Sequence, residues 1–236
     1  MSRVALVTGG SGALGSEVVR ALAGAGARVI FTFLRSSDRA ETIAKETGAT
    51  AVPVDLRDRT ATRSFVAALA RDGVVPDVFV HCAGVSRPTD LAQTDDAAFD
   101  EVMDVSARAA WVLAQSLAPG MANAKRGDIV LVGALDRTQS VSMPVHFAAA
   151  NGALAALAMG LAKELGVTGV RANFVALGPL EGGISRDLPP KLLADYRAFS
   201  ALRRVAAPAE VARFLAWLSL ENTFVSGKSI PLNGGL

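Results

Sequence analysis

The amino-acid sequence predicts a doubly wound α/β fold, in which a parallel sheet is covered by helices on both faces. Two observations predict it. Short apolar runs alternate with longer segments that have the 3.6-residue period of amphipathic helices. The short runs are apolar throughout, as expected for strands that are buried on both faces. Such alternation requires right-handed crossover connections, which place the strands parallel to one another.

Seven apolar runs are the predicted strands, and six longer segments are the predicted helices. The strands are expected at 4–7, 29–32, 51–54, 78–81, 129–132, 172–176 and 229–232. The helices are expected at 14–23, 38–46, 61–70, 97–117, 147–165 and 209–218. Segment 182–204 has no strand pattern and is longer than ordinary connections. We predict that it forms a lid over the strand ends, with a short helix at 192–199.

Composition is that of one globular domain. A length of 236 residues fits a single α/β domain, 1–236. Hydrophobic residues make up 51% of the chain and charged residues 19%, which excludes disorder and provides a large core. The net charge is only +2, and the basic residues are scattered rather than clustered with aromatic residues. We therefore expect no nucleic-acid partner.

The sequence favours a cytoplasmic location. Its first residues lack a charged segment followed by a long apolar one, and the longest apolar stretch, 153–162, is interrupted by Gly160 and too short for a bilayer. We therefore expect no membrane association. The single cysteine, Cys82, cannot form an internal disulfide, and its place at the end of an apolar run predicts a buried core thiol.

A glycine-rich segment, TGGSGALG at 8–15, follows the first predicted strand and opens the first predicted helix. Glycines at such a turn let backbone N–H groups and the positive end of the helix meet a pyrophosphate without obstruction by Cβ atoms. Glycines also form plain tight turns, so the position within a βαβ unit is what favours a dinucleotide site.

With this motif the chain resembles the short-chain dehydrogenase/reductase family, especially its 3-oxoacyl-[acyl-carrier-protein] reductases and polyketide ketoreductases. The family signature is TGxxxGxG, and Ala13 stands at its middle glycine. The closing segment 227–235, GKSIPLNGG, is similar to the family's last strand and tail. The resemblance covers the whole chain. It implies a single Rossmann-like domain with a seven-stranded parallel sheet, a short lid before the last helix and, by analogy, a homo-oligomer, either dimer or tetramer.

The resemblance also implies a set of cofactor-binding residues. Asp55 and Leu56 match the family's adenine contact, and HCAG at 81–84 matches its NNAG motif. No acid follows the second strand to accept the ribose hydroxyl of NAD. Arg35 stands there and favours the 2′-phosphate of NADP(H), a solvated surface arginine being the alternative. The implied set is Gly9, Ser11, Gly12, Leu14, Gly15, Arg35, Asp55, Leu56, Ala83 and Gly84. Binding of NADP(H) and binding of no cofactor both remain open.

The four catalytic positions of the family carry residues of other types here. Its asparagine, serine, tyrosine and lysine fall on Ser106, Ala134, Phe147 and Asn151. Phenylalanine has no proton to donate, asparagine has no charge to lower the pKa of a neighbouring hydroxyl, and alanine has no hydroxyl for a substrate carbonyl. The PG motif reads Leu177-Gly178, and the threonine that contacts the nicotinamide falls on Gly182. The nicotinamide end therefore differs from the family pattern, whereas the adenine end is mostly kept.

Other residues are candidates for a replacement acid or base. The candidates are His146, Asp136, Arg137, Ser140, Ser142 and Ser106. His146 precedes the tyrosine position, and imidazole titrates near neutrality, but neighbouring residues of a helix point about 100° apart. That objection weakens if the helix begins later. Asp136 and Arg137 form either a cleft acid with its partner or a solvated loop pair, and we favour the loop pair. We expect His81 to be a hydrogen-bonded structural histidine.

Three hypotheses follow. The first is a non-catalytic pseudoenzyme that serves as a subunit or scaffold beside an active ketoreductase or an acyl carrier protein in fatty-acid or polyketide-type metabolism. The second is an atypical NADPH-dependent ketoreductase with water or His146 as the proton source. The third is a cofactor-independent dehydratase, isomerase or cyclase that uses His146 or Asp136 in the same cleft. The first explains all four substitutions at once.

Overall fold

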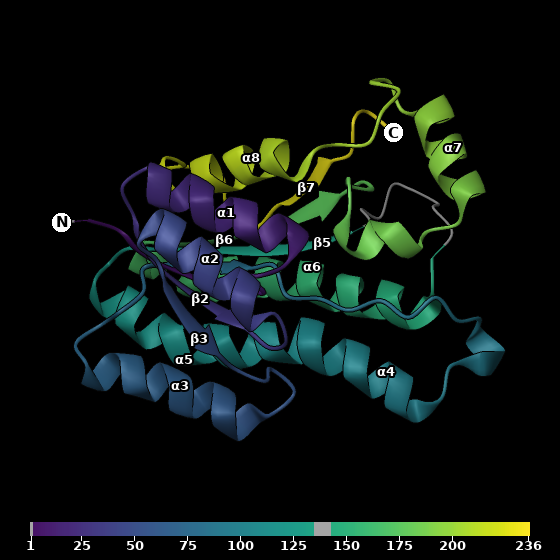
Figure 1. Ribbon diagram of the computed structural model, residues 1–236. Coiled ribbons are helices and arrows are strands. Elements are labelled where there is room, and N and C mark those ends of the chain that lie inside the picture. Colours follow the sequence, from purple (N-terminus) through teal and green to yellow (C-terminus); the bar gives the residue numbers. More distant parts are fainter. Residues whose placement is uncertain (1, 135–142) are drawn as a thin grey trace.

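Seven parallel strands form one sheet in the computed structural model, which describes residues 2–134 and 143–236. The order across the sheet is β3-β2-β1-β4-β5-β6-β7 (Figure 1). The bounds are β1 Val4–Thr8, β2 Arg28–Phe33, β3 Thr50–Pro53, β4 Val78–His81, β5 Gly127–Ala134, β6 Val170–Leu177 and β7 Ser229–Leu232. The bounds of each predicted strand differ from those of the observed strand by at most two residues. The predicted Rossmann-like fold is confirmed.

The helices cover both faces of the sheet. Their bounds are α1 Ala13–Gly24, α2 Ser37–Thr47, α3 Arg59–Arg71, α4 Asp96–Met103, α5 Ala109–Asn123, α6 Val145–Leu165, α7 Pro190–Phe199 and α8 Pro208–Leu220. Figure 1 shows α1, α2 and α8 on one face and α3, α5 and α6 on the other. Each face has its own buried apolar cluster, one around Phe31 and Leu22 and one around Phe79 and Phe174. The strands are apolar throughout because both faces are covered.

The predicted helix over 97–117 lies within an unbroken helical run at 96–123, which contains a π-helical turn that the sequence analysis did not predict. The structure divides it into α4, a π-helical turn η2 at Asp104–Arg108, and α5, which continues through Pro119 to Asn123. A π-turn adds one residue to a helical turn, and no proline or glycine between 96 and 118 marks it in the sequence. The turn places Ser106 at the carboxyl-end edge of the sheet, next to the site described below.

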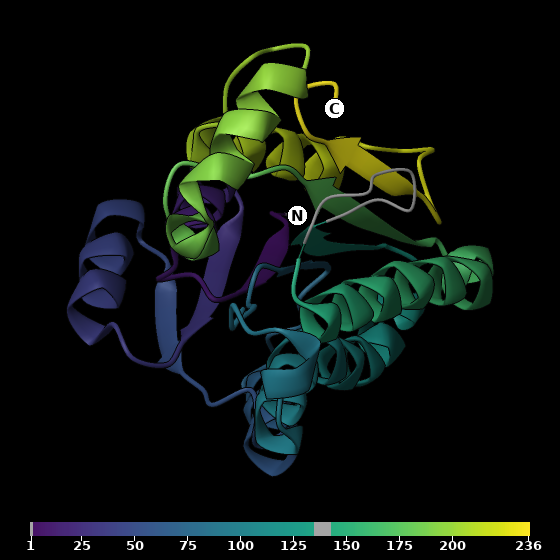
Figure 2. The same ribbon diagram turned by 90° about the vertical axis from the view of Figure 1, so that its right-hand side faces the viewer.

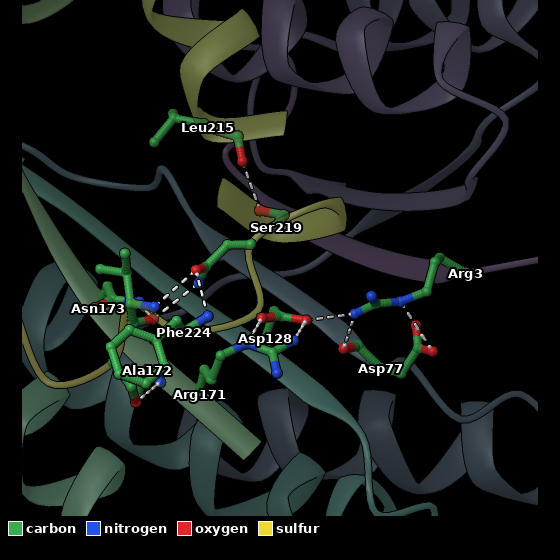
Figure 3. Close-up of polar contacts among 12 residues, drawn as sticks. Arg3, Asp77, Asp128, Arg171, Ala172, Asn173, Leu215, Ser219 and Phe224 are labelled. Atoms are coloured by element: carbon green, nitrogen blue, oxygen red, sulfur yellow. Dashed lines mark hydrogen bonds and ion pairs between the residues drawn. The ribbon is translucent and has the colours of Figure 1, made fainter. Parts of the chain in front are cut away.

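A buried ion-pair network joins the strands at the opposite, amino-terminal edge of the sheet (Figure 3). Asp128 of β5 is 2% exposed and accepts two hydrogen bonds from Arg171 of β6, at 2.8 and 2.9 Å. Arg3 lies 2.7 Å from the same carboxylate and 3.2 Å from the carboxylate of Asp77, which precedes β4. Buried carboxylates are tolerated because each is paired and hydrogen-bonded in this way. The network ties four strands together far from the edge that carries the site.

Helix α6 has a longer apolar run than the sequence analysis expected. With the turn that follows it, Val145–Thr168 is long and apolar enough to cross a bilayer by length and composition, with a mean hydropathy of 1.5. In the fold it packs on β5 and β6. Only 28% of the apolar window is buried, and the exposed side includes Val145 and Met159. One face of α6 is therefore apolar and uncovered in the single chain.

The predicted lid consists of a 3₁₀ turn η4, Gly183–Asp187, and helix α7. Figure 2 shows α7 standing beside the C-terminal segment. The hydroxyl of Tyr196 donates a hydrogen bond to the carbonyl of Asn233 at 2.5 Å, and the backbone N–H of Leu202 donates to the carbonyl of Gly234 at 3.0 Å. The tail thus holds the far end of the lid in place.

Candidate functional site

A cavity of about 280 Å³ lies at the carboxyl ends of the central strands. Its walls are the glycine-rich turn after β1, the ends of β4, β5 and β6, the start of α6, and the lid. Ligands of open α/β sheets bind at this edge, where the strand order reverses between β1 and β4. Ala134 and Met143 both line the cavity. The candidates Asp136, Arg137, Ser140 and Ser142 fall between them, outside the described residues.

The structure brings together the four residues that the sequence analysis aligned with the family's catalytic positions. All of them line this one cavity, coming from η2, the end of β5 and the first turns of α6: Ser106, Ala134, Phe147 and Asn151. The four residues span 45 positions of the chain and lie on three different elements. Sequence reasoning therefore grouped them only through the resemblance. Their side chains therefore determine which polar and apolar groups this part of the cavity offers to a ligand.

Asn151 does not extend into the cavity as a free polar group. Its Oδ1 accepts a hydrogen bond of 2.7 Å from the backbone N–H of Ala134, and its Nδ2 donates one of 2.7 Å to the carbonyl of Phe147. The residue is 4% exposed. A Cβ on Gly133 would collide with Oδ1, so this glycine makes room for the amide. The Asn151 side chain therefore fastens α6 to β5 and, unlike a lysine, brings no ammonium to the cavity.

Phe147 and Ser106 complete the inner wall. Phe147 presents an apolar ring where the family resemblance places a phenol. Ser106 is 4% exposed, and among the described residues its hydroxyl has no hydrogen-bond partner. A buried hydroxyl without a partner is rare and calls for a reason, such as a ligand or an ordered water. Among the described residues, nothing engages this hydroxyl.

Two titratable side chains line the described part of the cavity wall, and both are held in their neutral forms. Cys82 was expected to be a buried core thiol, but it is only partly buried and faces the cavity. Burial raises the pKa of its thiol to about 12. Tyr196 is the chain's single tyrosine, and burial raises the pKa of its hydroxyl. Sequence reasoning missed Tyr196 because it lies in the lid helix, although a lone tyrosine there was a usable signal.

His146 lies outside the cavity wall. Helix α6 begins at Val145, so the helical geometry already applies at His146 and turns it away from the direction of Phe147. The imidazole is 2% exposed, and neither ring nitrogen has a hydrogen-bond partner among the described residues. His146 is not among the residues that line the cavity. Its use as an acid or base would require a different path to a substrate.

His81 is the structural histidine that the sequence predicted. It is fully buried in β4, its Nδ1 is hydrogen-bonded to the hydroxyl of Thr8 at 2.9 Å, and its ring meets Phe79 edge-on. Burial lowers the pKa of its imidazole to about 4, against the opposite influence of the backbone at Ser106 and Val105. The ring is therefore neutral near pH 7 and ties the first strand to the fourth below the cavity.

The glycine-rich turn has the shape that the motif predicts. Gly9 has a positive φ of 66°, and a Cβ on Gly15 would collide with the carbonyl oxygen of Gly9. Gly12 caps α1 without a side chain. Six members of the predicted cofactor set line the cavity, namely Gly9, Gly12, Leu14, Gly15, Ala83 and Gly84. Ser11, Arg35, Asp55 and Leu56 do not, and the side chain of Leu56 is buried in the core.

Charged side chains lie at the carboxyl ends of β2 and β3, where the resemblance implies the adenine contact. The carboxylate of Asp55 is held by Arg57 at 2.6 Å, which lowers its pKa with a smaller contribution from the charge of Arg35. Arg87 pairs with Glu101 at 2.6 Å. Arg35 is exposed and has no ion-pair or hydrogen-bond partner in the described chain. It is a cation available to an anionic ligand at the end of β2.

Comparisons with known proteins agree with this geometry. A family model described as enoyl-(acyl carrier protein) reductase matches residues 10–236. A solved short chain dehydrogenase/reductase family protein is 32% identical, with a TM-score of 0.85, over 99% of this chain and 96% of that one. This chain belongs to the short-chain dehydrogenase/reductase family. A blue fluorescent protein from a metagenomic library, solved with NADPH, is 28% identical with a TM-score of 0.90, over 99% of this chain and 97% of that one.

Two curated members of the short-chain dehydrogenase/reductase family illustrate its range. The 3-oxoacyl-[acyl-carrier-protein] reductase MabA of Mycobacterium tuberculosis is 29% identical over 100% of this chain and 93% of its own length. The cyclic-di-GMP-binding biofilm dispersal mediator protein of Escherichia coli is 31% identical over 98% of this chain and 96% of its own length. The relatives thus include a reductase and a protein named for nucleotide binding.

The amide of Asn151 should contribute measurably to stability. In Asn151→Leu the N–H of Ala134 loses its acceptor, and we expect the free energy of unfolding to fall by about 1–3 kcal/mol in urea titrations. The matched control is Asn123→Leu, at an exposed position at the end of α5, with a change within about 0.5 kcal/mol. Equal changes in the two variants would contradict a fastening role.

The buried imidazole of His81 should make stability depend on pH. The folded state disfavours its charged form, whereas the unfolded chain takes up the proton near the usual pKa of 6.5. Its contribution is therefore complete above about pH 6.5 and is lost as pH falls toward about 4, by at most about 1.4 kcal/mol per pH unit. Urea titrations of wild type and His81→Asn across this range should diverge; parallel profiles would disprove the assignment.

Proposed function

We propose that this chain is a short-chain reductase homologue that no longer reduces carbonyl groups and acts as a non-catalytic subunit or scaffold in fatty-acid or polyketide-type metabolism. The observation that carries the proposal is the amide of Asn151. It stands at the family's lysine position and has both of its polar atoms hydrogen-bonded to the backbone. An amide has no positive charge and no titratable proton, so it cannot lower the pKa of a neighbouring hydroxyl as a lysine would.

The rest of the described wall supports the same conclusion. Reduction of a carbonyl requires a proton as well as a hydride, and a suitable acid contributes about 10²–10⁴-fold to the rate. Phe147 has no proton to give, and Ala134 has no hydroxyl to stabilise a developing oxyanion. The proton of Tyr196 is already donated to the carbonyl of Asn233, and burial opposes its ionisation.

The residues of the site fit the two halves of NADP(H) unequally. In this family NADP(H) supplies the hydride when it is bound. The glycine-rich turn and Arg35 are suited to its phosphates, because they offer backbone N–H groups at a helix start and an unpaired cation. The inner end lacks the residues that would act on a substrate beside its nicotinamide. A relative named for binding cyclic-di-GMP offers a parallel for a binding role on this fold.

The uncovered face of α6 supports an oligomeric role. Its exposed residues between Val145 and Met159 include no charged side chain. An apolar surface of this kind favours burial against another chain. We propose that a second copy covers it in a dimer or tetramer, and that an active ketoreductase or an acyl carrier protein is the functional partner. The protein is proposed to act in the cytoplasm.

Two alternatives make other demands on the site. An NADPH-dependent ketoreductase that uses His146 needs this ring to reach the cavity, which it does not line. A ketoreductase that uses water needs a position for that water, and the free hydroxyl of Ser106 is the group that favours it. A dehydratase, isomerase or cyclase fits the apolar wall but needs an acid or base beyond those of the described residues.

Restoring the family residues tests the proposal. The triple variant Ala134→Ser, Phe147→Tyr, Asn151→Lys should oxidise NADPH with a β-ketoacyl thioester at least about 10²-fold faster than the wild type at millimolar NADPH, because it regains an acid. The control is the double variant that keeps Phe147, which should stay at the wild-type rate. Wild-type turnover above an enzyme-free control that equals the turnover of a folded triple variant would overturn the proposal.

A further inference from the structure

The cavity is one continuous space of the size of a small ligand. Gly12 of the glycine-rich turn, Ile184 of the lid and Leu154 of α6 all line it. Its volume of about 280 Å³ lies just below the usual range of small-molecule pockets, roughly 300–1,000 Å³. At about 30 Å³ for each group the size of a water molecule, it holds roughly ten non-hydrogen atoms. A nicotinamide with its ribose has more atoms, so the space beneath the lid suits a smaller molecule.

The wall of this cavity is mostly apolar, and none of its described residues has a charged side chain. Its larger side chains include Met143, Phe147, Leu154, Leu177, Ile184 and Leu192. Moving a carboxylate or an ammonium group from water into such surroundings is costly unless an opposite charge is present. An apolar body, by contrast, gains free energy when it leaves water. The described wall therefore selects a neutral and mostly apolar molecule.

The hydroxyl of Ser106 can hold such a molecule in place. Ser106 lines the cavity, is 4% exposed, and has no hydrogen-bond partner for its Oγ among the described residues. The amide of Asn151 and the hydroxyl of Tyr196 also line the cavity, but both are already hydrogen-bonded to backbone groups. A buried hydroxyl without a partner has lost the hydrogen bond that it makes in water. A carbonyl or hydroxyl group of a ligand would restore that bond.

The space beside this hydroxyl is open. The Oγ of Ser106 lies 3.8 Å from the point where a Cβ on Gly84 would lie, and the Cδ1 of Ile184 lies 3.8 Å from the same point. Apart from Gly84 and its chain neighbours, no other described atom comes within 4 Å of this point. Because glycine has no side chain, the point stays empty. A ligand atom placed there would reach a hydrogen-bonding group and an apolar methyl group at once.

We propose that the cavity binds one small neutral molecule without a cofactor, with its apolar body against the wall and its single carbonyl or hydroxyl group held by Ser106. This inference deepens the proposed function and rests on it, because a non-catalytic subunit can hold a ligand that it does not convert. The anchor differs from the family pattern, whose carbonyl-binding residues fall on Ala134 and Phe147 here. Hydride transfer requires a carbonyl compound and a nicotinamide to be bound together, whereas this ligand fills the space alone.

Calorimetric titration of the full chain with 2-nonanone and with octanoate tests the proposal. The two probes have the same number of non-hydrogen atoms, and only octanoate is charged. The ketone should bind without NADPH, with a dissociation constant of about 0.1 mM or lower. Octanoate should bind at least about tenfold more weakly, because a carboxylate in an uncharged wall has no partner. Added NADPH should weaken the binding of the ketone or leave it unchanged.

The variant Ser106→Ala tests the anchor. It removes the hydroxyl and should weaken the binding of 2-nonanone about three- to tenfold, as expected for the loss of one hydrogen bond. The matched control is Ser116→Ala, the same change in helix α5 at a residue outside the cavity wall. Its affinity for the ketone should equal that of the wild type.

The possible results separate this inference from the proposed function. The inference is overturned if 2-nonanone does not bind, if octanoate binds as tightly, if NADPH tightens the binding of the ketone, or if Ser106→Ala binds like the wild type. The proposed function survives these results as long as the wild type reduces no β-ketoacyl thioester. Reduction of such a thioester by a protein that binds the ketone as described would overturn the proposed function alone. Reduction of 2-nonanone itself would overturn both.

Discussion

The site depends on one side chain, the amide of Asn151, which joins the first turns of α6 to the end of β5. Both hydrogen bonds of the amide go to backbone groups at 2.7 Å, and Gly133 provides the space that the amide fills. Such an amide is satisfied and buried, so it stabilises the junction of helix and sheet. An amide is also uncharged and does not titrate near neutral pH, so this side chain offers the cavity no acid, base or positive charge.

The two edges of the sheet serve different purposes. At the amino-terminal edge, buried carboxylates and arginines join four strands (Figure 3). They stabilise the sheet through contacts that involve no residue of the site. At the carboxyl edge the cavity is lined mainly by small and apolar residues, and a lid held by Tyr196 and the C-terminal tail lies over it. The strand pairing of the sheet therefore does not depend on which side chains line the cavity.

Much of the fold could be predicted because burial on both faces leaves a direct mark, the short apolar run. The four residues at the catalytic positions could be grouped through the family motifs, and the structure places them in one cavity. The π-turn at Ser106 could not be predicted, since no proline or glycine between 96 and 118 marks a change of helical geometry.

The central claim is that no hydride reaches a carbonyl in this cavity. The most direct measurement uses NADPH that carries deuterium at the transferable position of its nicotinamide, a β-ketoacyl thioester, and mass spectrometry of the product. Our account predicts that the wild-type protein forms no deuterated hydroxyacyl product above an enzyme-free control. A product that gains one deuterium, in amounts exceeding the protein present, would contradict it.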